Sequence, residues 1–242
     1  MSDQFPMSST YARAGAVVDA GLRAHMQRVY NRMTAGLFVT FLVAFIASNA
    51  PVVSAFVTNP MVAMVLAFSP LAVIWFGFNP MTMNSSKLRA SFMLLSVLYG
   101  LSFTAIFMVY VPADIARALF ITTIMFAGLS IFAYTTKTDL KPVGVFCMMG
   151  MFGLLALTVV SMLGSAFGAF EISSGFTTLI SIASIVIFAG LTAWETQATK
   201  EMYHPGNGEE GNSRMAWAAA LNLYISFIAM FQSILQLLGN RE

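Results

Sequence analysis

Seven long apolar segments with few charged residues constrain this chain more than any other feature. A helix needs about 20 mostly apolar residues to cross a bilayer, because it rises about 1.5 Å per residue. Each segment meets that length, so the sequence predicts an all-α integral membrane protein, a bundle of seven transmembrane helices. The predicted spans are approximately 33–57, 60–79, 90–111, 115–134, 143–164, 175–197 and 216–238.

The composition excludes an ordinary soluble domain. Hydrophobic residues make up 58% of the 242 residues and charged residues only 9%, against about 45–50% and about 25% in soluble proteins. The net charge is only +2, and the sequence has no long cluster of lysine and arginine. The lack of such a cluster argues against nucleic acid as a partner. The expected partner is the lipid bilayer. Cys147 is the only cysteine, so it is expected to pack as a small apolar side chain.

The cations predict the orientation of the chain, because lysine and arginine are retained on the cytoplasmic side. The connections between the predicted spans lie alternately on the two sides of the membrane. Ten of the twelve cations fall on the side that also holds the N-terminus. The exceptions are Arg117 and Arg241. This predicts a multi-pass membrane protein with a cytoplasmic N-terminus and a C-terminus on the opposite side of the membrane.

Outside the spans the sequence predicts little structure. Residues 1–14 are polar and expected to be a disordered cytoplasmic tail, and residues 15–32 to form a separate interfacial helix. Residues 33–238 make up the transmembrane domain. The segment 204–213, rich in glycine and asparagine, is expected to be a cytoplasmic loop.

Catalysis has little support in the residues. The only two histidines, His25 and His204, lie in cytoplasmic segments, and no predicted span contains an aspartate. A serine–histidine pair or a pair of aspartates within the membrane therefore cannot be assembled. The sequence predicts no enzyme, no catalytic residue and no cofactor.

Glu195 is the unusual residue, in the stretch "GLTAWETQATKEMY" at 190–203. It lies about 7 Å inside Lys200 at 1.5 Å per residue. One interpretation is that the span ends at Trp194 and Glu195 is hydrated. The other is that the carboxyl group lies inside the membrane, where a charge costs roughly 2.5–3.5 kcal/mol on insertion scales and usually belongs to an ion or proton route.

Two polar stripes favour the second interpretation. At 100° per residue, one arc of the sixth span and one arc of the seventh each carry polar side chains, so the two stripes are predicted to face each other. Serine and threonine are also common packing residues in membrane helices, and for them alone that explanation is favoured. The stripes comprise Thr177, Ser181, Ser184, Thr192 and Glu195 on the sixth span, and Asn222, Ser226, Ser233 and Gln236 on the seventh.

Three stretches resemble one membrane-protein family. They are "LTAWETQATKEMY" at 191–203, "LNLYISFIAMF" at 221–231, and the middle segment 100–140, which ends in "YTTKTDL". The chain resembles the Bax inhibitor-1 (YccA-like) family over about residues 20–240. The resemblance implies a seven-helix fold, calcium leak, pH-dependent gating and, for some bacterial members, modulation of a membrane protease.

The resemblance also implies a sensor made of two carboxylates, one on each of the last two spans. By position the first falls on Glu195 and the second on Ser226, which is no acid. Two close carboxylates raise each other's proton affinity and titrate as a pair, so a lone Glu195 is expected to give a single-proton response shifted from that of the family. Calcium, which prefers several carboxylates, is expected to bind weakly, with Glu195 the one candidate ligand.

Two functions follow as expectations. The first is a pH-sensitive leak for calcium or another cation, with Glu195 as the titratable gate and Asn222 and Ser226 as neutral partners. Ser226 lies twelve residues after Arg214 and is therefore expected to be deeper in the membrane than Glu195. Asn222, one turn earlier, is expected to be the closer partner of Glu195. The second is a non-conducting regulator that contacts another membrane protein, such as a quality-control protease.

Overall fold

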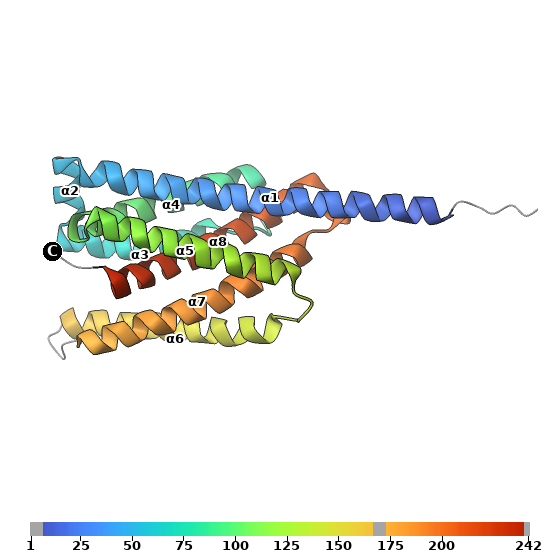
Figure 1. The fold of residues 1–242 in the computed structure, drawn as a ribbon. Helices are drawn as coiled ribbons and strands as arrows, with labels where there is room; N and C mark the ends of the chain where they lie inside the picture. Colours follow the sequence, from blue (N-terminus) through green and yellow to red (C-terminus); the bar gives the residue numbers. More distant parts are fainter. Residues whose placement is uncertain (1–6, 167–172, 240–242) are drawn as a thin grey trace, which may run out of the picture.

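The computed structural model describes residues 7–166 and 173–239, which form eight α-helices and one short 3₁₀ turn (Figure 1). Seven helices are long and apolar enough to cross a membrane, which confirms the predicted fold class. The elements are α1 (Met7–Ser48), α2 (Pro51–Val57), α3 (Pro60–Gly77), α4 (Ser85–Val109), α5 (Pro112–Thr135), α6 (Lys141–Ala166), α7 (Ser174–Met202), η1 (Pro205–Asn207) and α8 (Gly208–Leu238).

The first span differs from its predicted limits of 33–57. Helix α1 runs unbroken from Met7 to Ser48, and the remainder of the predicted span is the separate helix α2. Pro51 explains the break, since the residue before a proline is pushed out of helical geometry. Ala50 accordingly has extended backbone angles.

The N-terminal segment also differs from the expectation of a disordered tail at 1–14 and a separate helix at 15–32. Residues 7–14 and 15–32 both belong to α1, which projects beyond the bundle in Figure 1. The segment 7–32 contains no proline, and its two glycines, Gly15 and Gly21, are not adjacent, so it lacks a strong signal to end the helix. Residues 1–6 lie outside the described part of the chain.

Prolines and asparagines mark the turns between spans. Pro60 and Pro112 occupy the first turns of α3 and α5, where the missing N–H costs no helical hydrogen bond. The side chains of Asn59 and Asn84 accept backbone hydrogen bonds at the starts of α3 and α4. These caps fix where each helix enters the bundle.

Helix α8 lies at the centre of the bundle. In its most apolar stretch 72% of the residues are buried, against 6–33% in the other six candidate spans. It contacts α1, α4, α5 and α7. Two of its aromatic rings pack on helix α4: Tyr224 lies 5.4 Å from Phe92, and Phe231 lies 6.1 Å from Phe103, between ring centroids. Burial on most sides explains why α8 is positioned by packing rather than by lipid.

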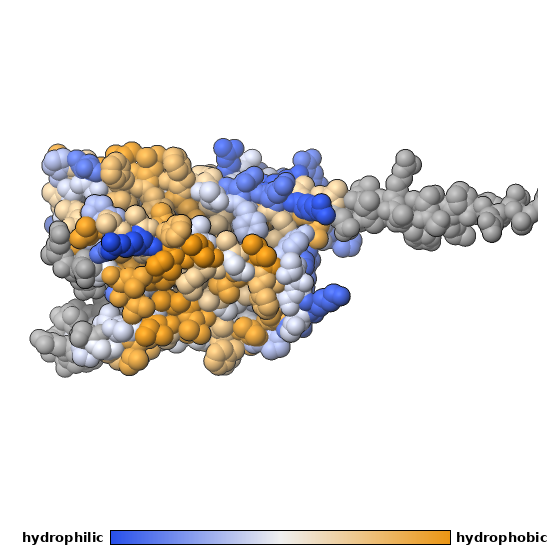
Figure 2. Space-filling view, viewed as in Figure 1, coloured by the Kyte–Doolittle hydropathy of each residue, from blue (hydrophilic) through white to orange (hydrophobic). Residues whose placement is uncertain are grey.

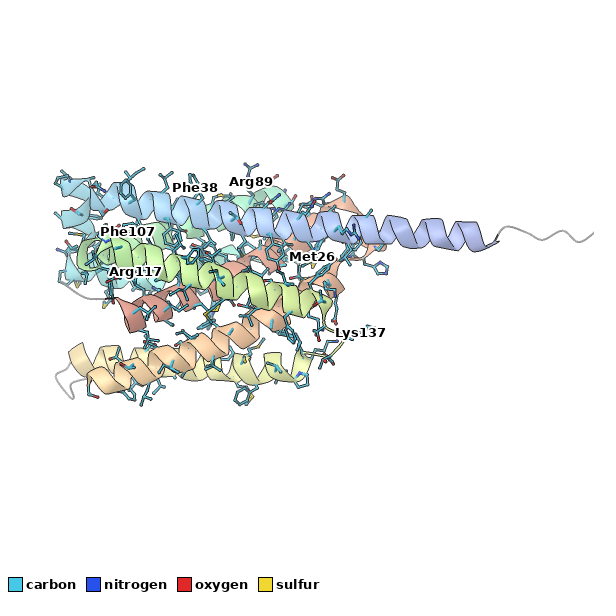
Figure 3. All side chains as sticks on the ribbon, viewed as in Figure 1. Met26, Phe38, Arg89, Phe107, Arg117 and Lys137 are labelled. Carbon is cyan, nitrogen blue, oxygen red and sulfur yellow. The ribbon has the colours of Figure 1, made fainter. Side chains whose placement is uncertain are left out.

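The outer surface is apolar around the middle of the bundle. Figure 2 shows a hydrophobic band with hydrophilic patches toward its ends. Large side chains such as Trp75, Phe76 and Phe146 are more than 70% exposed on this surface, which suits contact with lipid rather than water. Arg117 lies at the end of the bundle opposite to Lys137 (Figure 3), as the separation of cations predicts.

Helix α6 packs chiefly on α7, through glycines that let the two backbones approach closely. A Cβ atom added to Gly144 would overlap the ring of Trp194, and one added to Gly190 would overlap the sulfur of Cys147. Small residues at such positions are typical of helix pairs in membranes. Cys147 is buried there, as expected of a small apolar side chain.

We predict that Gly144→Ala destabilises the protein, because the added methyl group pushes α6 away from Trp194. Overpacking of this kind costs about 1–3 kcal/mol. Thermal unfolding in detergent, followed by circular dichroism, measures the change. Gly153→Ala on the same helix is the control, because nothing lies within 4 Å of its added Cβ. Equal midpoints for the two variants would contradict the close packing of α6 on α7.

Candidate functional site

Glu195 of α7 and Ser226 of α8 meet inside the bundle. The Ser226 hydroxyl donates a hydrogen bond of 2.8 Å to Oε2 of Glu195. Ser226 is buried and Glu195 is half-buried. The two positions that the family resemblance pairs are therefore in contact, as a carboxyl group and a neutral hydroxyl.

Asn222 does not take the position predicted for it. Its side chain is exposed, one helical turn before Ser226, and among the described residues the hydrogen bond to Glu195 comes from Ser226. We predicted that Asn222, and not Ser226, would be the closer partner of Glu195. The hydrogen bond from Ser226 shows that this prediction was wrong.

The prediction estimated the depth of each residue in the membrane from its distance along the helix to a cation. Lys200 is five residues from Glu195, or about 7.5 Å, and Arg214 is twelve residues from Ser226, or about 18 Å. Since Glu195 and Ser226 touch, Arg214 must lie roughly 10 Å farther along the bundle than Lys200. The count assumed that both cations lie at one level, which the lengths of α7 and α8 do not require.

A second contact joins the two polar stripes. The Ser181 hydroxyl of α7 donates to the Gln236 side-chain oxygen of α8 at 3.1 Å. Ser181 lies fourteen residues before Glu195 and Gln236 ten residues after Ser226, so the two contacts are near opposite ends of the α7–α8 interface. The stripes therefore face each other at two places.

The other stripe residues have simpler roles. Thr177, Thr192 and Ser233 each donate to the backbone oxygen four residues earlier in the chain, which for Thr177 belongs to Ser173 just before α7. Ser184 is buried. Bonds to the helix's own backbone satisfy a hydroxyl without any route for ions, so these residues support the packing explanation.

Three hydroxyl groups that meet at Thr196, the residue after Glu195, were not predicted from the sequence. Thr196 is buried, and its Oγ1 lies 3.5 Å from the hydroxyl oxygens of both Ser130 on α5 and Tyr30 on α1. This turn of α7 is thus held against two further helices. The available signal was Thr196 itself, next to the acid, but nothing in the sequence indicated that Ser130 or Tyr30 would reach it.

The start of α8 is tied to the rest of the bundle by charged side chains. The Arg32 guanidinium donates to the backbone oxygen and hydroxyl of Ser213 at 2.7 and 2.9 Å, and stacks over Trp217 at 4.1 Å. The carboxylate of Glu210 accepts two bonds of 2.7 Å from Ser85 at the start of α4. These bonds fix α8 to α1 and α4 at this end of the bundle.

Comparison with known proteins identifies the family. A sequence profile described as "Inhibitor of apoptosis-promoting Bax1" matches residues 22–242. The chain belongs to the Bax inhibitor-1 family. A protein of Caulobacter vibrioides is 35% identical over 243 residues, 95% of this chain and 94% of that protein. The inner membrane protein YbhL of Escherichia coli K12 is 32% identical over 244 residues, 99% of this chain and 100% of YbhL.

Two stretches that carry the resemblance to the Bax inhibitor-1 family touch in the structure. Gln197, two residues after Glu195, accepts a hydrogen bond of 2.8 Å from the Leu140 amide and donates one of 2.9 Å to the Thr138 carbonyl. Lys200 donates to the Tyr134 carbonyl at 2.7 Å. The turn "YTTKTDL" is therefore bound to the end of α7 that carries Glu195.

Metal binding has limited support in this Bax inhibitor-1 protein. Among the residues that the structure describes, no three His, Cys, Asp or Glu side chains come together. Glu195 has one neutral oxygen ligand beside it, from Ser226, whereas a stable calcium site uses six to eight oxygens. The described residues around Glu195 therefore do not assemble the oxygen ligands of a stable calcium site.

We predict that Gln197→Ala lowers the stability of the protein, because it leaves the Leu140 amide and the Thr138 carbonyl without their partner. The bond to Leu140 is part-buried and the bond to Thr138 is exposed to water, so we expect a loss of about 0.5–1.5 kcal/mol, the net contribution of an ordinary hydrogen bond. Thermal unfolding in detergent measures the loss, with Gln232→Ala, a half-buried glutamine on α8, as the control. A loss no larger than that of the control would show that Gln197 does not hold the turn.

Proposed function

We propose that this protein is a pH-sensitive leak for calcium or a similar cation, gated by Glu195. The observation that carries the proposal is the bond between Glu195 and Ser226 at the interface of two apolar helices. An ionisable group in such a segment is costly and is usually retained for an ion or proton route. In this proposal Asn222, which is exposed one turn before Ser226, is a further polar group on the route and not a direct partner of Glu195.

The neutral partner gives the gate a distinct response to protons. A hydroxyl both donates and accepts, so Ser226 can bond to Glu195 whether the carboxyl group is ionised or protonated. A pair of carboxylates instead repels when both are ionised. Protonation of Glu195 therefore changes the charge of the route without breaking the α7–α8 contact, and the response involves one proton.

A single carboxylate also favours passage over retention of calcium. Calcium binds tightly where several carboxylates replace its water, and here Glu195 acts with neutral oxygens. The cation then keeps much of its hydration and leaves readily. Slow, low-affinity flux is the behaviour that this arrangement supports.

Ser226 also supports a second function, a non-conducting regulator that contacts another membrane protein such as a quality-control protease. The lack of a second acid weakens the case for a gate that works by carboxylate pairing. Helix α6 has suitable surface, since it packs chiefly on α7 and exposes apolar side chains including Phe146 and Met149. Under this proposal Glu195 and Ser226 join helices and nothing more.

The proposed location is a bacterial inner membrane, with the N-terminus in the cytoplasm and the C-terminus in the periplasm. The positive-inside rule supports this orientation, as does the position of Arg117 opposite to Lys137 (Figure 3). YbhL, a relative over nearly the full length, is named an inner membrane protein.

Single cysteines in a Cys147→Ala background test the orientation. Ser86 and Ala113 are both exposed, at the starts of α4 and α5. In intact spheroplasts we expect a membrane-impermeant maleimide to label Ala113→Cys and not Ser86→Cys. Permeabilised cells should label both, which controls for reactivity. The reverse pattern in spheroplasts would overturn the proposed orientation.

Calcium flux into liposomes that contain the purified protein tests the leak. We expect the native protein to show flux with a single-proton dependence on pH, and Glu195→Gln to lose that dependence because the titrating group is gone. Ser226→Asp restores a second carboxylate and should give a steeper, two-proton dependence. Glu201→Gln, an exposed carboxylate paired with Lys141 at 3.3 Å, is the control and should resemble the native protein.

Two outcomes separate the proposals. Absence of flux in the native protein and in all variants would reject the leak and leave the regulator. Unchanged, pH-dependent flux in Glu195→Gln would keep the leak but place its gate elsewhere.

A further inference from the structure

A groove of about 300 Å³ lies between α6 and α7, at the end of the bundle that carries Lys137 (Figure 3). Neither Glu195 nor Ser226 lines it. Its volume is at the lower end of the range for small-ligand pockets, about 300–1,000 Å³, so it can hold part of a lipid molecule. We call it the α6–α7 groove, and its wall is formed by Lys141, Val145, Trp194, Gln197, Ala198 and Glu201.

The groove lies where the membrane-spanning helices reach the edge of the bilayer. Lys141 is the first residue of one candidate span, and Glu201 is the last but one of another. Trp194 lies seven residues before Glu201, about 10 Å along the helix. On α6, Val145 and Phe146 are 58% and 73% exposed, so this surface meets lipid chains. A molecule in the groove therefore has a polar end beside the two charges and an apolar end beside the tryptophan.

The polar end of the groove carries one charge of each sign. Nζ of Lys141 lies 3.3 Å from Oε2 of Glu201, and the side chains are 61% and 53% exposed. An ammonium group has three donors and a carboxylate about four acceptor positions, so this contact leaves capacity on both groups. An exposed ion pair is also held weakly. A ligand with one positive and one negative group can therefore bind beside the pair or replace it.

The third polar side chain in the wall is already in use. Gln197 accepts from the Leu140 amide and donates to the Thr138 carbonyl, so its amide group is bound to the α5–α6 connection. The rest of the wall, Val145, Trp194 and Ala198, is apolar or aromatic. Recognition of a headgroup therefore falls to the two charged side chains, and the remaining wall suits an acyl chain.

The two charges distinguish among phospholipid headgroups. Phosphatidylethanolamine carries a phosphate and a primary ammonium joined by two carbons, which matches Lys141 and Glu201 side by side. Phosphatidylcholine has the same phosphate, but its quaternary ammonium has no N–H to donate to a carboxylate. Phosphatidylglycerol has no cation, and Glu201 repels its phosphate. Anionic headgroups are bound by clusters of cations, whereas the charged side chains in this wall are one lysine and one glutamate.

We propose that the α6–α7 groove binds one molecule of phosphatidylethanolamine. The phosphate lies at Lys141, the ammonium at Glu201, and the start of an acyl chain against Trp194. The site does not depend on whether the protein conducts ions. Calcium flux is measured in phosphatidylcholine liposomes, where the preferred lipid is absent, so the site leaves that experiment and its Glu201→Gln control unchanged.

Quenching of Trp194 fluorescence by brominated lipids tests the site directly. Trp75 is 78% exposed and is replaced by phenylalanine, while Trp217 is buried beneath Arg32 and contributes a constant background. The protein in maltoside micelles is titrated with phosphatidylethanolamine, phosphatidylcholine or phosphatidylglycerol, each brominated on its acyl chains. We expect half-maximal quenching at about a threefold lower fraction of phosphatidylethanolamine than of phosphatidylcholine, the effect of one exposed charged contact. Phosphatidylglycerol should be the weakest of the three.

Matched variants assign the two charges to the two parts of the headgroup. Glu201→Gln should remove the preference, so that phosphatidylethanolamine and phosphatidylcholine quench at equal fractions. Lys141→Gln should weaken both lipids about threefold, because they share the phosphate. Lys137→Gln is the control, since Lys137 is an exposed cation at the same end of the bundle and outside the wall. Thermal unfolding in the same detergent checks that each variant is folded.

Several results would overturn the proposal. Equal quenching by phosphatidylethanolamine and phosphatidylcholine in the native protein would show that the ammonium is not recognised. Strongest quenching by phosphatidylglycerol would indicate a general attraction to anionic lipid. An unchanged preference in Glu201→Gln, or an effect of Lys137→Gln as large as that of Lys141→Gln, would show that the lipid does not bind at this pair of charges.

Discussion

The burial of α8 is the constraint on which the rest of this bundle depends. A membrane helix gains nothing from hiding apolar surface from lipid, so close packing and a few polar bonds must hold it in place. Here Tyr224 and Phe231 pack on the aromatic rings of α4, while Arg32 and Glu210 fix the first turns of α8 to α1 and α4. The other helices take their positions around this helix.

The site follows from that arrangement. With α8 held on its far side by α1 and α4, the face that meets α7 carries Ser226 and Gln236, and each has a partner on α7. The turn of α7 that carries Glu195 is fixed in its own right, by Thr196 toward α5 and by Gln197 toward the α5–α6 connection. The backbones of both α7, which carries Glu195, and α8, which carries Ser226, are therefore held in place by other contacts.

Sequence alone was sufficient for the number and order of the seven long apolar helices, because hydropathy and the distribution of cations are local properties. It failed at Pro51, where a single residue ends a helix within an apolar run. For the site, helical phase correctly put Glu195 and Ser226 on facing stripes. It could not choose between Ser226 and Asn222, since that depends on how far one helix is shifted along the other. The contacts of Arg32, Gln197 and Ser130 join residues 57–181 positions apart and leave no pattern in the sequence.

The dependence of α6 on α7 has a mechanical consequence. Because side chains pack closely on the glycines of their shared face, and α6 packs chiefly on that one neighbour, a displacement of α7 would carry α6 with it. If α7 tilted against α8 at the Glu195 contact, two helices, α6 and α7, would be displaced within the lipid instead of one. The work of that motion is then done against the bilayer, so its thickness and lateral tension bear directly on how readily the α7–α8 interface parts.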